Sequence, residues 1–157
     1  MEAEGGAGPD SRTPFIGEYR HTLDDKARVI LPRPFRDELD KGLVMTAWLD
    51  NCLTVLPKDG WQRVLTSLRN LQYTDREQRQ FIRMMMSSAH AGELDKQGRV
   101  TIPARLREYA AIAREVTVVG ADDHLELWDI ARWEEYREQG MAEFASTSKS
   151  FDLGGIF

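Results

Sequence analysis

The 157-residue sequence predicts an α+β fold, mainly β, built of two tandem pseudo-symmetric halves with flanking helices. One observation is an internal repeat, because residues 23–37 align without gaps on residues 94–108 and six of the fifteen positions are identical. The pattern resumes downstream, where 52–61 aligns on 124–133. Each half also alternates short β-branched runs with amphipathic segments. Since about 70 residues make only a marginal domain, the two halves are expected to share one core.

Each half is predicted to contain the same series: a strand entering a polar turn, a strand leaving it, a short helix, a hairpin and a longer helix. In the first half these are 15–23, 28–31, the segment after Pro32, the hairpin 43–56 and the helix 58–71. In the second half they are 89–94, 99–102, the segment after Pro103, the hairpin 116–128 and the helix 130–144. A further helix is predicted over 74–86, because Thr74-Asp-Arg-Glu77 has the pattern of a capping box.

These elements divide the chain into a first module at 14–71 and a second module at 89–144. A connecting helix is predicted at 72–88. The segments 1–13 and 145–157 lack periodicity and are expected to be a disordered N-terminal tail and a mobile C-terminal tail.

Composition excludes several classes of protein. With 41% hydrophobic and 30% charged residues, the chain is of the soluble globular kind. It has no apolar run near the ~20 residues of a membrane span and no signal peptide, so a cytoplasmic protein without a membrane partner is expected. One cysteine and three scattered histidines predict no disulfide, no metal site and no cofactor.

The charge is polarised although the net charge is −5, which argues against a general polyanion binder. Residues 26–36 and residues 96–107 each contain four cations and no acid, on an otherwise acidic chain. Taken alone, such a run is an ordinary solvated surface. Its duplication at equivalent positions favours a phosphate-binding face. With the acid that precedes each run, the candidate DNA-binding residues are Asp24, Lys26, Arg28, Arg33, Arg36, Asp95, Lys96, Arg99, Arg105 and Arg107.

The turn of each half has the spacing Asp-x-x-x-Arg, as Asp24 with Arg28 and as Asp95 with Arg99. The carboxylate can hold its arginine across the turn and so preorganise the guanidinium. A guanidinium suits either a phosphate or the O6/N7 edge of guanine, whereas Lys26 and Lys96 suit phosphate contacts.

The sequence around both turns resembles the MraZ family of bacterial transcriptional regulators. The resemblance rests on residues 17–28, 31–32 and 35–36 in the first half, and on 93–103, 106–110, 118–120 and 125–128 in the second. It implies two swapped-hairpin β-barrel modules of the SpoVT-AbrB type and a ring-shaped homo-oligomer, with an octamer as the candidate size. It also implies a nucleoid-associated protein that binds double-stranded DNA at short direct repeats upstream of the division and cell-wall operon, which includes its own gene.

One position departs from the family pattern, because Ala27 stands where the second turn has Gly98. A positive φ is costly for alanine, so strain is expected if the first turn keeps the geometry of the second.

Two rival functions remain. A swapped-hairpin module that serves only in assembly, or that binds a protein as an antitoxin does, would show no salt-dependent DNA binding. A small hydrolase that uses the repeated carboxylates would need a divalent metal. The DNA-binding regulator, without catalytic activity or a small-molecule substrate, is the interpretation that the duplicated arginine turns favour. Cys52, in an apolar strand, is expected to be an inert buried thiol.

Overall fold

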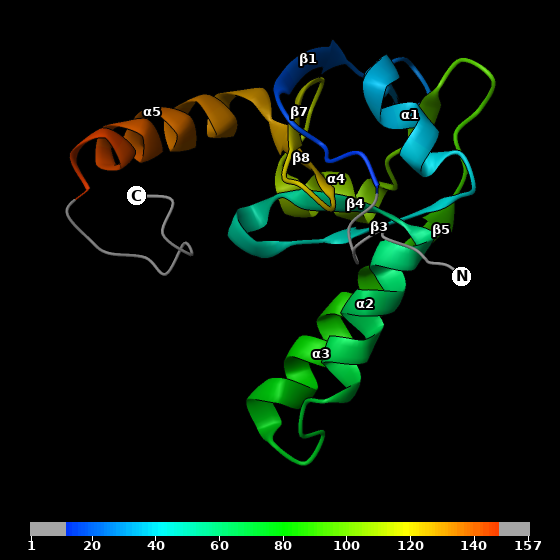
Figure 1. Cartoon of the computed structure of the whole chain (residues 1–157), viewed down its shortest axis with the longest axis vertical. Coiled ribbons are helices and arrows are strands. Elements are labelled where there is room, and N and C mark those ends of the chain that lie inside the picture. Colours follow the sequence, from blue (N-terminus) through cyan, green and yellow to red (C-terminus); the bar gives the residue numbers. More distant parts are fainter. Residues whose placement is uncertain (1–11, 148–157) are drawn as a thin grey trace, which may run out of the picture.

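The centre of the molecule is a six-stranded antiparallel sheet, seen in a computed structural model that describes residues 12–147. Its strand order is β1-β7-β8-β4-β3-β5 (Figure 1). The strands are β1 (Glu18–Thr22), β3 (Leu43–Ala47), β4 (Leu53–Pro57), β5 (His90–Gly92), β7 (Glu115–Gly120) and β8 (Leu125–Asp129). A second ladder pairs β2 (Arg28–Ile30) with β6 (Arg99–Thr101). The predicted α+β class is therefore confirmed, and every strand pair among the described residues is antiparallel.

Five helices surround these strands in the described part of the chain. They are α1 (Arg33–Leu39), α2 (Lys58–Arg69), α3 (Arg76–Ser88), α4 (Ala104–Ala110) and α5 (Ile130–Ser146). Two of them, α2 and α3, project together away from the sheet, and α5 projects in another direction (Figure 1). None of the described helices is long and apolar enough to cross a membrane.

The two halves exchange strands. β1, from the first half, pairs with β7 of the second, whereas β5, from the second half, pairs with β3 of the first. The hairpins meet where β4 pairs with β8, with Leu53 opposite Leu127. Each half thus borrows its outer strand from the other.

One hydrophobic core joins both halves, as the repeat predicts. Leu31 and Phe35 of the first half lie in the same buried cluster as Ile102 and Leu106 of the second. This cluster fills the space between one face of the sheet and the β2–β6 ladder with α1 and α4. Residues in β3 and β4 are buried on both faces, because α3 covers the other side of β3, where Thr46 Oγ1 donates to the carbonyl of Met85 at 3.0 Å. Their nearly continuous apolar sequence is typical of strands covered on both faces.

Several local boundaries differ from the sequence predictions. The first strand begins at Glu18, and Phe15 reaches the sheet only through an isolated bridge to Asp122. The cap of α3 is not Thr74, because the carboxylate of Asp75 accepts the N–H of Gln78 at 3.0 Å. Aspartate and threonine both suit this position, so the pattern alone did not determine which residue starts the helix.

Parts of both predicted tails belong to the described residues. Arg12 Nη1 donates to the carbonyl of Asp122 at 3.0 Å, and the N–H of Thr13 donates to Glu38 at 3.0 Å. At the other end, residues 145–146 are the last residues of α5. The remainder of the two predicted tails, residues 1–11 and 148–157, lies outside the described residues.

Candidate nucleic-acid interface

Each repeated turn is closed by its aspartate. In the first turn, Asp24 Oδ1 accepts the N–H groups of Lys26 and Arg28, both at 2.9 Å, and Oδ2 accepts Arg28 Nε at 2.7 Å. The N–H of Ala27 also donates to the Asp24 carbonyl at 3.0 Å. The aspartate holds its arginine, as the Asp-x-x-x-Arg spacing predicts, and the same side chain also fixes the backbone of the turn.

The second turn repeats this geometry. Asp95 Oδ1 accepts the N–H groups of Gln97 at 2.9 Å and Arg99 at 2.8 Å, and Oδ2 accepts Arg99 Nε at 2.7 Å. The N–H of Gly98 donates to the Asp95 carbonyl at 2.9 Å. Each arginine and each aspartate keeps about a third of its side chain exposed, between 27% and 34%.

The pairing of β2 with β6 places the two turns at the two ends of one short antiparallel ladder. Arg28 opposes Thr101 and Ile30 opposes Arg99, and the ladder continues beyond the strands where the N–H of Leu31 donates to Gly98 O at 2.9 Å. As a result, Arg99 Nη1 lies 3.9 Å from Asp24 Oδ2 of the other half. This contact joins the Asp95–Arg99 pair of the second half to the Asp24–Arg28 pair of the first.

The backbone of both turns is left-handed at the residue before the arginine. φ is 79° at Gly98 and 59° at Ala27. The first turn has therefore kept the geometry of the second, and the alanine bears the strain expected at that position.

The two arginines differ in their freedom. Arg99 Nη2 donates to Gln97 Oε1 at 3.1 Å, so a neighbouring amide also restrains the end of its guanidinium. The equivalent residue in the first turn, Lys26, cannot accept a hydrogen bond. Within the described residues, no hydrogen bond occupies Nη1 or Nη2 of Arg28. A guanidinium held by Nε presents its two Nη groups to a bidentate acceptor such as phosphate or guanine.

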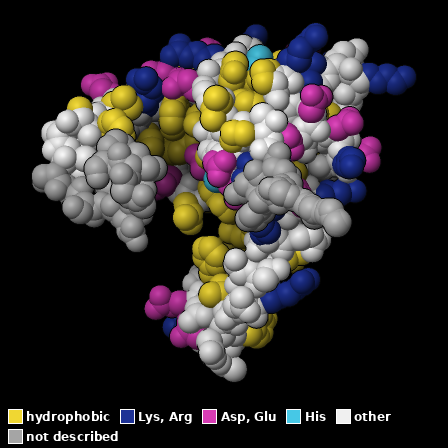
Figure 2. All heavy atoms as spheres, viewed as in Figure 1, with side chains coloured by type: hydrophobic (Ala, Val, Ile, Leu, Met, Phe, Trp, Pro, Cys, Tyr) yellow, Lys and Arg dark blue, Asp and Glu magenta, His cyan; other side chains and the backbone are white. Residues whose placement is uncertain are grey.

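The other predicted cations fall into two groups. Four are exposed and form no ion pair with another described residue: Lys26, Arg33, Lys96 and Arg105. The remaining two, Arg36 and Arg107, are half-buried, and each donates Nε to the carbonyl that precedes the proline, Leu31 O at 2.9 Å and Ile102 O at 3.0 Å. These two arginines stabilise the strand-to-helix connection. In Figure 2, Lys and Arg side chains lie at the upper right, over α1 and the loop before β6.

The ionisation of the two aspartates follows from these bonds. The N–H of Arg28 is the largest cause that lowers the pKa of Asp24, followed by the Arg28 side chain and the N–H of Lys26. Arg99 and Gln97 lower the pKa of Asp95 in the same way. Both carboxylates are therefore ionised at neutral pH and neutralise the arginines that they hold. The positive charge of the face comes from its four exposed cations and from Arg36 and Arg107, which bind carbonyl oxygens.

Sequence reasoning did not identify His21, a half-buried residue on β1 that adjoins the cationic face. Burial, and then the charge of Arg36, lower the pKa of His21, so this ring is neutral beside the cationic face. The repeat alignment could have indicated that His21 is special, because His21 aligns with Gly92 and the two halves cannot pack alike at this position.

A second titratable cluster lies between the two hairpins. His124 Nδ1 lies 2.8 Å from Asp123 Oδ1, and its Nε2 lies 3.1 Å from Glu126 Oε2. Burial alone would lower the pKa of His124, but the bonds and charges of the two carboxylates outweigh it and raise that pKa. Cys52 is buried, as predicted, and its burial, together with the nearby Glu126, raises the pKa of the thiol far above its usual range.

No group of three or more His, Cys, Asp or Glu side chains in residues 12–147 is placed to hold a metal ion. The carboxylates that a metal-dependent hydrolase would need, Asp24 and Asp95, are each occupied by an arginine and by two backbone N–H groups. Such carboxylates have little freedom to coordinate a divalent ion.

These features define a class: tandem-repeat proteins in which each repeat supplies one aspartate-closed arginine turn to a shared face. The family model described as "MraZ protein, putative antitoxin-like" matches the chain twice, at residues 15–84 and 85–153. The chain therefore belongs to the MraZ family.

Relatives agree over nearly their whole length. The chain is 49% identical over 142 residues to the protein named transcriptional regulator MraZ of Moorella thermoacetica, covering 88% of this chain and 99% of that protein. A protein of the same name from Kocuria rhizophila is 42% identical over 143 residues, covering 91% and 99%. Another from Syntrophomonas wolfei is 39% identical over 141 residues, covering 89% and 99%.

Ala27→Gly should stabilise the protein by about 0.5 kcal/mol, because relief of the left-handed strain at alanine exceeds the added chain entropy of glycine. The reverse change, Gly98→Ala, should destabilise it by at least about 1 kcal/mol, since the new Cβ would collide with the Arg36 guanidinium. Chemical denaturation measures both changes. Ala111→Gly is the matched control for the relief of strain, because this alanine also has a positive φ, 55°, but lies outside the turns at the end of α4. Destabilisation by Ala27→Gly would contradict the assigned strain.

Asp24→Asn and Asp95→Asn should each destabilise the protein at neutral pH. The folded-state pKa of each aspartate is lower than its ordinary value of 3.8, so the ionised form contributes stability that is complete above about pH 4 and is lost as the pH falls through the folded pKa. The deficit of each variant relative to the parent should therefore shrink in acid. Denaturation curves from pH 7 to 3 measure this, with the exposed Asp25→Asn as control. A deficit that is independent of pH would refute the assigned ionisation.

Proposed function

We propose that this protein is a sequence-specific transcriptional regulator that binds double-stranded DNA and has no catalytic activity. The observation that carries the proposal is the pair of arginines, Arg28 and Arg99, held by Asp24 and Asp95. The names of the relatives, transcriptional regulator MraZ, support the same class of function.

The proposed reading heads are the two turns. Arg28 and Arg99 enter the major groove and meet guanine edges or phosphates, whereas Lys26, Lys96, Arg33 and Arg105 contact the phosphate backbone. Arg36 and Arg107 support the connections behind the turns. On an acidic chain, such a restricted basic face gives weak and salt-sensitive contact with one short site.

The proposed architecture of each reading unit is the swapped-hairpin β-barrel of the SpoVT-AbrB type, with modules at 14–71 and 89–144 joined at 72–88. The exchange of β1 and β5 between the halves supports it. The proposed assembly is a ring-shaped homo-oligomer, with an octamer as candidate size. The proposed target is a set of short direct repeats upstream of the division and cell-wall operon that includes its own gene, in a cytoplasmic, nucleoid-associated protein.

A second candidate is an assembly module or an antitoxin-like protein-binding module that does not bind DNA. This candidate is supported by the description of the matching family model, which contains the words putative antitoxin-like. It differs from the first proposal in one measurable property, because it lacks salt-dependent affinity for the upstream DNA.

Arg28→Ala and Arg99→Ala should each weaken binding to the gene's own upstream region by roughly 1–3 kcal/mol, because a bidentate contact to a base is lost. Arg28→Lys should weaken it as well, since lysine keeps the charge without the planar fork. Fluorescence anisotropy measures the affinity, and circular dichroism checks the fold. Arg132→Ala, on the exposed start of α5, is the matched control. Parent-like affinity in both alanine variants would exclude the turns as reading heads.

Affinity should rise steeply with the number of repeats in the DNA. Heads joined in one oligomer engage each further repeat at high effective concentration, which adds roughly 100-fold or more. Probes with one, two or three repeats measure this increase. Spacers lengthened by half a helical turn should abolish it, because the added repeat then faces the opposite side of the duplex. Equal affinity for one and three repeats, or indifference to the spacer, would refute a rigid multi-headed reader.

A further inference from the structure

The two arginine turns differ in how firmly they hold the end of the arginine. In the second turn, Asp95 Oδ2 accepts a hydrogen bond from Arg99 Nε at 2.7 Å, and Gln97 Oε1 accepts one from Arg99 Nη2 at 3.1 Å. Asp24 Oδ2, from the other half, lies 3.9 Å from Arg99 Nη1. In the first turn, the Arg28 guanidinium has one partner among the described residues, Asp24 Oδ2, at 2.7 Å from Nε. Arg99 is thus contacted at three nitrogens and Arg28 at one.

Neither burial nor backbone geometry causes this difference. The side chains of Arg28 and Arg99 are 27% and 29% exposed. The N–H of Lys26 and the N–H of Gln97 each donate to the aspartate of their turn at 2.9 Å, so the two residues occupy the same backbone position. Their side chains differ, because an amide oxygen can accept a hydrogen bond and an ammonium group cannot. Gln97 is therefore the origin of the additional hydrogen bond on Arg99.

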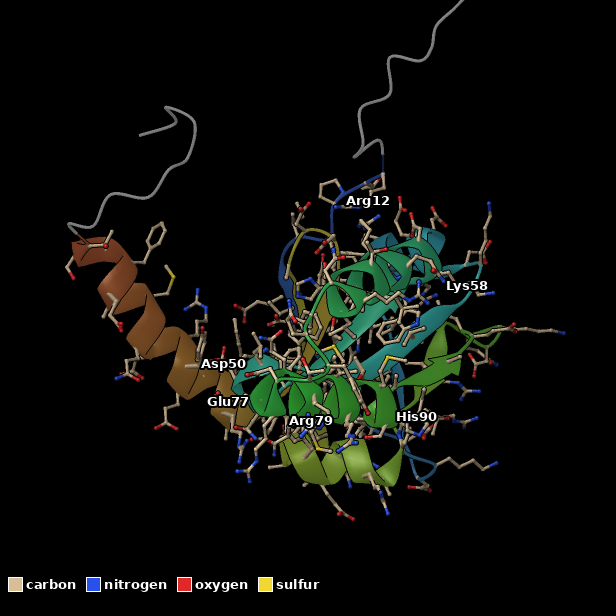
Figure 3. All side chains as sticks on the ribbon, turned by 90° about the horizontal axis from the view of Figure 1, so that it is seen from below. Arg12, Asp50, Lys58, Glu77, Arg79 and His90 are labelled. Carbon is tan, nitrogen blue, oxygen red and sulfur yellow. The ribbon has the colours of Figure 1, made fainter. Side chains whose placement is uncertain are left out.

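The second turn lies where it can meet a large ligand. It belongs to the loop that follows β5, whose first residue is His90, and this loop reaches the outer edge of the molecule (Figure 3). Gln97 itself is exposed. The bond between Gln97 and Arg99 is thus part of the surface that presents the guanidinium to an acceptor.

Restraint changes what an arginine can bind. A guanidinium that is fixed in direction forms a bidentate contact with little further loss of side-chain entropy, but only with an acceptor in one position. A guanidinium that is tethered through Nε alone can turn toward a phosphate when the preferred base edge is missing. The first kind of arginine discriminates strongly between base pairs, and the second tolerates substitutions in the DNA.

We propose that Gln97 is a positioning residue that makes the second turn the more selective of the two DNA-reading turns. It holds Arg99 in the direction of one guanine edge, whereas Arg28, which has Lys26 in place of a glutamine, can exchange a base contact for a phosphate contact. One chain therefore reads one part of its site strictly and another part loosely. This inference rests on the proposed DNA-binding function and adds the division of specificity between the turns.

The restraint is measured without DNA, by NMR of the guanidinium nitrogens. Rotation about the Nε–Cζ bond should be roughly 2- to 10-fold slower in Arg99 than in Arg28, the effect of one hydrogen bond. Gln97→Met keeps the length of the side chain but removes the amide acceptor, so it should speed up Arg99, and Gln97→Glu should restore slow rotation. Lys26→Gln should slow Arg28. Equal rates in the parent, or an Arg99 rate that Gln97→Met leaves unchanged, would contradict the restraint.

The specificity is measured by fluorescence anisotropy at low salt, with single-repeat probes from the gene's own upstream region in which each base pair is replaced in turn. The base pairs that each arginine reads are those whose replacement loses its effect in Arg99→Ala or in Arg28→Ala. In Gln97→Met, the penalty for replacing the Arg99 base pairs should fall roughly 2- to 10-fold. In Lys26→Gln, the penalty at the Arg28 base pairs should rise by a similar factor.

Lys96→Gln is the matched control, because it removes the same charge as Lys26→Gln from the other turn, at a position that is not equivalent to Gln97. It should weaken binding to all probes alike, as expected for a phosphate contact. Penalties that Gln97→Met leaves unchanged, or that Lys26→Gln changes no more than Lys96→Gln does, would overturn this inference while the proposed function stands. A parent that binds none of the upstream DNA would refute both.

Discussion

The antiparallel pairing of β2 with β6 is the constraint on which the rest of the molecule depends. This ladder has only three residue pairs, yet it joins the two halves with one arginine turn at each of its ends, since each strand begins at the arginine of its turn. The same strands supply Val29 and Val100 to the common core, so the position of the turns is fixed by hydrophobic packing. The geometry of the charged face is therefore a consequence of the core.

Exchange of strands extends this dependence to the sheet. Without β5, strand β3 would be an exposed edge, and without β1 the same would hold for β7. An open edge is a liability because its backbone groups can pair with other chains. Each half thus covers an edge strand of the other, in agreement with two segments of a size that is marginal alone forming one body.

Much of the fold could be predicted from the repeat. Six identical positions in fifteen located both turns, and the Asp-x-x-x-Arg spacing predicted that each aspartate holds its arginine, which it does at Nε. Amphipathic spacing located α2 and α5, and a capping-box pattern located α3. These features are local in sequence, so composition and spacing are sufficient to indicate them.

The remainder depended on contacts between distant segments. No local pattern indicates that β1 pairs with a strand almost a hundred residues away, or that Arg99 lies 3.9 Å from Asp24. The carbonyl partners of Arg36 and Arg107 could not be predicted either, because the sequence shows where a cation is but not the direction of its side chain. The neutral His21 owes its state to burial, which appears only when the halves are assembled.

The covalent connection of the two halves releases them from symmetry. In a dimer of identical chains, every substitution would occur at both turns at once, and a change tolerated at one place would have to be tolerated at the other. Here the two halves differ at equivalent positions of the repeat, Lys26 against Gln97 and Ala27 against Gly98. As a result, Arg99 is bound by the Gln97 amide, while Arg28 keeps both Nη groups free of hydrogen bonds within the described residues. A single chain can therefore acquire two specialised copies of the aspartate-closed arginine turn, each altered by its own mutations.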